Sequence, residues 1–199
     1  MARHLVVGLL TVLMLQASLA PAASPVSAEE LPKEKGVART VKMFDMFCLT
    51  QLPNIDGIAR FAGFGEFAQI TDDELEPYKL RTPAEELQAW RFHDLGAELI
   101  LTASRSKPDE TFKKQFPAFA NSRNVACSLL IPNGDPAEEI VKQIAHRLGR
   151  EPDETRNEAG TQVYGWNAQT DRTVSRVYYR APAEQGRKST LSASAFVKD

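Results

Sequence analysis

Apolar residues recur at helical spacing in three stretches of the chain. Val37, Val41, Phe44 and Cys48 lie three or four positions apart, which predicts a helix over 37–50. After Pro53, Asn54 can cap a second helix that ends at the glycines Gly63 and Gly65. The clearest amphipathic pattern covers 136–148.

The third predicted helix has recognisable signals at both ends. Asp135 is suited to the cap, and Pro136 to the first helical position, where no backbone N–H is needed. Gly149 follows the last apolar residue and predicts the C-terminal stop. The buried stripe contains Ile140 and Ile144.

Alternation of apolar and polar residues elsewhere predicts strands. Six are expected: 87–94, 98–105, 124–131, 161–167, 172–181 and 189–198. The first two form a hairpin around Leu95–Gly96. The chain is therefore predicted to be an α+β protein, with an antiparallel sheet of about six strands and two or three helices on one face.

A short sequence echo raises the alternative of an internal repeat. Cys48-x4-Pro53 precedes the second helix, and Cys127-x4-Pro132 precedes the third, with an asparagine after each proline. Three strands follow each helix, so the domain would consist of two α-β-β-β units. A match of this length also arises by chance.

The N-terminus has the order of a secretory signal peptide. Arg3 and His4 precede an eleven-residue apolar run, Leu5–Leu15, and small residues follow. We place the cleavage between Ala28 and Glu29, and a second candidate follows Ala22. The alternative, an uncleaved anchor, is disfavoured because a spanning helix needs about 20 apolar residues.

Removal of residues 1–28 leaves a chain of single-domain size. Residues 29–36 are charged and predict a flexible N-terminus, and 37–199 a single α+β domain. Of the 24 Lys and Arg, 23 remain beside all 26 Asp and Glu, so the net charge is −3. This acidity argues against nucleic acid as a partner, and no later apolar run is long enough to span a membrane.

The two cysteines of the mature chain, Cys48 and Cys127, predict a disulfide. An even cysteine count in an exported protein favours a bridge over two buried thiols, because the compartment is oxidising. A CxxC motif is absent, so a redox role has no support.

Strand alternation assigns the candidate binding residues to one sheet face, opposite the apolar face that the helices cover. They are Arg91, His93, Arg176, Tyr178 and Arg180. Arginine and tyrosine suit an anionic ligand or a protein partner. The alternative is a plain solvated face of the sheet.

The sequence carries no catalytic or metal motif. Only His93 and His146 remain after export, and neither has companions at ligand spacing, so we expect no metal and no cofactor. The acidic run 72–76 lacks the spacing of a calcium loop and is read as a solvated loop. Serine nucleophile signatures are missing too.

The connection 106–122 contains a short helix in this interpretation, which presents Phe112, Phe116 and Phe119. Such a segment is either a satellite of the core or an exposed patch for a partner or a membrane surface.

Together these patterns predict an exported protein, periplasmic or extracellular, without enzymatic activity. It would bind a protein partner or a small anionic ligand through the open sheet face. The alternative is a small periplasmic hydrolase with a dispersed active site, which would need His93 within reach of a serine and an acid in a cleft.

Overall fold

The computed structural model describes residues 35–198, except 72, 77–83, 133 and 185–186. The predicted signal peptide, its cleavage site at Ala28 and Glu29, and residues 29–34 lie outside the described residues. The first described helix begins at Gly36, the last residue of the segment predicted to be flexible.

The fold is built on one antiparallel sheet of eight strands. The α+β class is therefore confirmed, whereas the expected number of six strands is wrong. The strands are β1 (Ala68–Gln69), β2 (Glu86–Asp94), β3 (Ala97–Ser106), β4 (Arg123–Ile131), β5 (Glu154–Glu158), β6 (Thr161–Gln169), β7 (Thr173–Pro182) and β8 (Ser189–Val197). The two additional strands are the edges: β1 has two residues, and β5 has the all-polar sequence ETRNE, so neither shows alternation.

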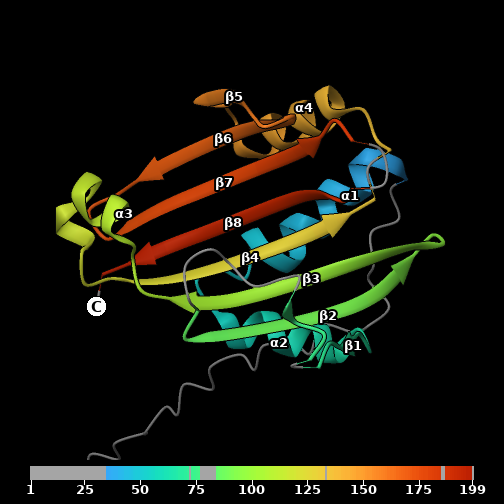
Figure 1. Ribbon diagram of the computed structural model, residues 1–199, viewed down its shortest axis with the longest axis horizontal. Coiled ribbons are helices and arrows are strands. Elements are labelled where there is room, and N and C mark those ends of the chain that lie inside the picture. Colours follow the sequence, from blue (N-terminus) through green and yellow to red (C-terminus); the bar gives the residue numbers. More distant parts are fainter. Residues whose placement is uncertain (1–34, 72, 77–83, 133, 185–186, 199) are drawn as a thin grey trace, which may run out of the picture.

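The strand order is symmetric about the middle of the sheet. It runs β1-β2-β3-β4-β8-β7-β6-β5, so two four-stranded meanders meet where β4 pairs with β8 (Figure 1). Each half begins with helix and continues with four strands, not the three of the proposed repeat unit. The cysteines of the sequence echo are not equivalent in space, because Cys48 lies in a helical turn and Cys127 in β4.

Three helical segments cover one face of the sheet (Figure 1). They are α1 (Gly36–Phe44), continued by the π-helical turn η1 (Asp45–Leu49), then α2 (Ile55–Phe64) and α4 (Ala137–Leu148). Their buried side chains share one core cluster with the sheet residues Trp90, Leu101, Trp166 and Tyr179.

The helix ends largely follow the sequence signals. The Asn54 side chain accepts a hydrogen bond from the backbone N–H of Gly57 at 3.0 Å, which caps α2. Gly149 closes α4 with a φ of 71°, a conformation that glycine adopts without strain. The start of α4 is shifted by one residue: the N-cap is Pro136 and not Asp135, and among the described residues this cap has no side-chain hydrogen bond.

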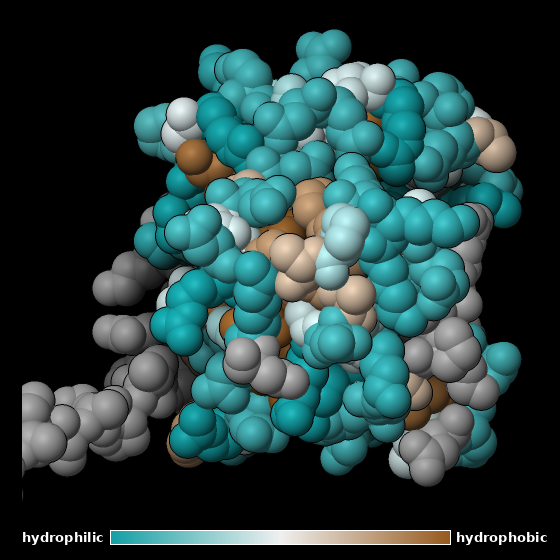
Figure 2. Space-filling view, turned by 90° about the vertical axis from the view of Figure 1, so that its left-hand side faces the viewer, coloured by the Kyte–Doolittle hydropathy of each residue, from teal (hydrophilic) through white to brown (hydrophobic). Residues whose placement is uncertain are grey.

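A fourth helix, α3 (Glu110–Gln115), lies against the opposite face of the sheet and is followed by the short turn η3 (Pro117–Phe119). Phe112 and Phe119 are buried with Val174 and Phe196 of β7 and β8, so the aromatic segment folds down as a satellite cluster. The Phe112 and Phe196 rings stack with centroids 3.7 Å apart. Figure 2 looks onto this end of the molecule, where hydrophilic residues surround a small apolar area.

The disulfide between Cys48 and Cys127 is present, and no cysteine is left free. It joins η1 to β4, and both cysteines are fully buried in the main core cluster. None of the helices in the described part of the chain has the length and apolar character needed to cross a membrane.

We predict that the double variant Cys48→Ala/Cys127→Ala is destabilised by about 4 kcal/mol, because the bridge closes a long loop in the unfolded chain. The sequence separation of the two cysteines is 79 residues. Urea denaturation of the oxidised protein and the variant measures the difference. Equal free energies of unfolding would show that the bridge does not stabilise the fold.

Candidate functional site

The sheet face opposite α1, α2 and α4 is the candidate site, and strand register decides which of its side chains are neighbours. A row of hydroxyl groups crosses its middle: Thr102 faces Ser128, Ser128 faces Ser192, and Ser192 faces Tyr178. We call these four residues the hydroxyl row. Because neighbouring strands lie about 4.8 Å apart, the row extends over roughly 14 Å.

Arg176 and Arg180 flank Tyr178 on β7, two positions before and after it, and all three point to the same face. The structure brings these three predicted residues together. The surroundings of the two arginines differ, however: Arg176 has a structural role, whereas Arg180 is available to a ligand.

Arg176 is held by the α3 segment. Its guanidinium carbon lies 5.1 Å from the Phe112 ring centroid and 5.4 Å from that of Phe116. Its Nη2 donates a hydrogen bond to Gln115 Oε1 at 2.9 Å. Stacking on aromatic rings and a bond to α3 make Arg176 part of the contact that holds this helix on the sheet.

Tyr178 is enclosed by polar neighbours from β5 and β7. Its ring lies over Gly165, where an added β-carbon would be only 2.7 Å from Tyr178 Cε1. The Arg180 guanidinium carbon lies 4.9 Å from the ring centroid. Burial raises the pKa of Tyr178, and the hydrogen bond and charge of Glu154 raise it further against the opposing charges of Arg176 and Arg156.

Arg180 is the more available cation. Its Nη1 lies 3.4 Å from Ser192 Oγ, a long hydrogen bond to one member of the hydroxyl row. Among the described residues no carboxylate pairs with it. Arg156, the neighbouring cation on β5, is by contrast bound by both Glu154 and Glu158.

Arg91 and His93 lie on the same face but far from this group. Four strand spacings separate β2 from β7, which is roughly 19 Å. Arg91 pairs with Glu98 at 3.2 Å and Glu74 at 3.7 Å. The pKa of Glu98 is lowered, first by a hydrogen bond from Lys188 and then by the charges of Lys188, Arg91 and His93. The five predicted residues therefore form two separate groups. In the group on β2, the positive charge of Arg91 is balanced by Glu98 and Glu74.

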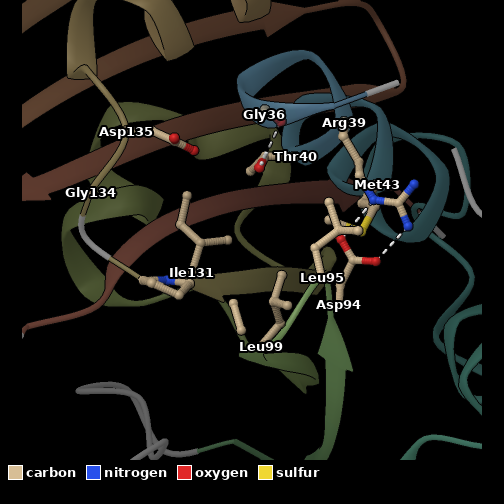
Figure 3. Close-up of a pocket in the computed structure, with 12 residues that line it drawn as sticks. Gly36, Arg39, Thr40, Met43, Asp94, Leu95, Leu99, Ile131, Gly134 and Asp135 are labelled. Carbon is tan, nitrogen blue, oxygen red and sulfur yellow. Dashed lines mark hydrogen bonds and ion pairs between the residues drawn. The ribbon is translucent and has the colours of Figure 1, made fainter. Parts of the chain in front are cut away.

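A small cavity of about 220 Å³ lies on the helical side of the sheet (Figure 3). Its wall contains a bidentate ion pair in which Arg39 Nε and Nη2 contact the two Asp94 oxygens at 2.7 and 2.5 Å. The side chains are only 12% and 9% exposed. This pair ties α1 to the β2–β3 hairpin. Apolar side chains such as Met43, Leu99 and Ile131 make up much of the lining, and Thr40 and Asp135 add further polar groups.

Histidine and acidic residues form no catalytic or metal arrangement in the described part of the chain. His93 is exposed and lies opposite Glu98 on β3, while its neighbour Asp94 points to the other face and binds Arg39. His146 is exposed on α4. No cluster of three or more His, Cys, Asp or Glu that suits a metal ion occurs among the described residues.

Sequence reasoning did not find the partners of the β7 residues. Glu154 and Arg156 belong to an edge strand that no apolar pattern reveals. The contact of Arg176 with α3 is a long-range one, between residues 61 positions apart. A weak signal existed, since a segment rich in phenylalanine must pack on some surface.

Comparison of the chain with protein-family models, with curated proteins and with solved structures found no match. The class that can be stated is therefore structural: an α+β domain with an eight-stranded antiparallel sheet and one internal disulfide.

We predict that Arg176→Ala lowers the free energy of unfolding by about 1–2 kcal/mol, because it removes the stacking on the phenylalanines and the bond to Gln115. Arg172→Ala is the matched control, since Arg172 is exposed in the turn before β7, and we expect a change within about 0.5 kcal/mol. Urea denaturation measures both. If the two variants were equally stable, Arg176 would not hold α3 in place.

We predict that Tyr178 loses its proton at a pH above its ordinary pKa near 10, because burial and Glu154 favour the neutral phenol. Its contribution to stability is then fully present below pH 10 and is lost as the pH rises through the higher, folded-state pKa. NMR of ¹³C-labelled tyrosine follows this titration. Glu154→Gln is expected to lower the Tyr178 pKa, whereas a Tyr178 that titrates below 10 in the unchanged protein would contradict the geometry.

Proposed function

We propose that this chain is an exported, non-enzymatic protein that binds a small anionic ligand on its open sheet face, with Arg180 as the principal contact. The observation that carries the proposal is the environment of Arg180: a guanidinium without a carboxylate partner among the described residues, next to Ser192 and Tyr178. Guanidinium and hydroxyl groups together match the oxygens of a carboxylate or phosphate.

The arrangement suits binding better than catalysis. The face offers hydrogen-bond donors around Arg180. His93 lies on the same face, but it is exposed, and its strand β2 is roughly 19 Å from β7 across the sheet. A hydrolase would need a nucleophile and a base within hydrogen-bonding reach of each other. The hydrolase alternative therefore has no observation that favours it.

Export is supported by two features. The first 28 residues have the pattern of a cleaved leader, and the folded domain contains a buried disulfide, which is typical of oxidising compartments. Both are consistent with a periplasmic or extracellular binding protein.

The experiment is an NMR titration of the mature, oxidised protein with citrate and with inorganic phosphate. We expect saturable shifts in the backbone amides around Arg180 and Ser192. In Arg180→Gln the affinity should fall roughly tenfold or more, as for loss of a charge-assisted hydrogen bond.

The control is Arg172→Gln, which makes the same change of charge at an exposed turn residue. Its affinity should be unchanged. Shifts that persist in Arg180→Gln, or that never occur on β7 and β8 at millimolar anion, would refute the proposed site.

A further inference from the structure

A second group of cations surrounds a pocket of about 550 Å³ at the end of the sheet where α3 lies. It is formed where β3 ends and β4 begins, together with α3 and the loop before β4. Its charged and hydroxyl lining consists of Arg105, Lys107, Lys113, Arg123, Ser106 and Ser122, with Glu85 as the one acid. We call it the end pocket.

The charge balance of the end pocket favours an anion. Four cations face one carboxylate in its lining, in a protein whose sequence is slightly acidic as a whole. Arg105 pairs with Glu86 at 3.0 Å and Lys113 with Glu110 at 2.7 Å, and both of these acids lie outside the lining. Lys107 lies 3.5 Å from Glu85. Because these ion pairs are partly or fully exposed, each contributes little to stability, and a bound anion can replace the carboxylate partner of the cation.

The floor of the pocket provides an independent indication. Ser122 is only 5% exposed, and its Oγ is buried without a hydrogen-bond partner among the described residues. A buried hydroxyl without a partner is costly, so the Ser122 side chain would gain by turning toward an acceptor in the pocket that this residue lines. Ser106 is equally buried and accepts a bond from Asn124 Nδ2 at 3.1 Å, which leaves its own proton to donate.

From these observations we infer that the end pocket is a binding site for a phosphate-type oxyanion. The two serine hydroxyls would donate to its oxygens from the buried side, and the lysine and arginine side chains would balance its charge from the rim. A concave site with a few convergent donors is the usual form of a small-ligand pocket. The volume exceeds that of inorganic phosphate, so a phosphate monoester of a small molecule also fits.

The end pocket is separate from the Arg180 site, and either site can be right if the other is wrong. Arg180 lies on β7, and none of the pocket residues belongs to β7 or β8. Site-resolved NMR shifts distinguish the two.

The test is a titration of the mature, oxidised protein with inorganic phosphate and with glycerol 3-phosphate. We expect saturable shifts at the amides of Ser106 and Ser122, with tighter binding of the monoester if an organic group fills the remaining volume. Lys113→Gln/Arg123→Gln should weaken binding at least tenfold. Its control, Lys142→Gln/Arg172→Gln, removes the same charge at exposed positions elsewhere and should bind as the parent protein does.

Ser122→Ala separates a ligand-binding serine from a structural one. Because the hydroxyl has no partner in the unliganded protein, the variant should be at least as stable as the parent without anion, yet bind phosphate more weakly. Loss of stability with unchanged binding would assign Ser122 a structural role and overturn the inference. Equal binding by the pocket variant and its control would overturn the inference as well. So would the absence of a saturable shift at about 10 mM anion, a concentration far above the dissociation constant expected of a specific site.

Discussion

The antiparallel pairing of β4 with β8 is the contact on which the rest of the structure depends. Nine residue pairs join Arg123–Ile131 to Ser189–Val197, and without them the two four-stranded meanders would each have an exposed inner edge. Small side chains on the helical side, such as Ala193 opposite Cys127, let η1 approach closely enough for the disulfide. On the other side the same pairing places Ser128 beside Ser192 and so creates the hydroxyl row.

The two faces of this sheet differ in how much of each is covered by helices. The helices bury one face almost completely, whereas α3 covers only the end of the other face where Phe112 meets Phe196. Arg176 is used to hold that cover in place. Arg180, four residues further along β7, makes no contact of this kind. The half-buried polar middle of the sheet around Arg180 and Ser192 is therefore the region that we assign to ligand binding.

Much of the fold was predictable because burial imposes periodicity. Most of the six inner strands alternate in the sequence, and Asn54 and Gly149 mark helix ends. Two cysteines behind a signal-peptide pattern indicate the bridge. The edge strands β1 and β5 escaped prediction because a short or wholly polar edge has no apolar side to reveal it. The face that carries the candidate site was predictable, because alternation placed Arg91 and Arg176 on the same side of the sheet. The contacts within that face were not predictable, because the strand order that separates these two residues is not encoded by any local pattern.

The central claim is that Arg180 is available to an anion. The most direct measurement is a crystal structure of the mature, oxidised protein grown with citrate at a concentration above the dissociation constant. The account predicts a carboxylate in contact with the Arg180 guanidinium and Ser192 Oγ, with β4 and β8 paired beneath them. An Arg180 that instead forms an ion pair with a carboxylate of its own chain, with no citrate on this face, would contradict it.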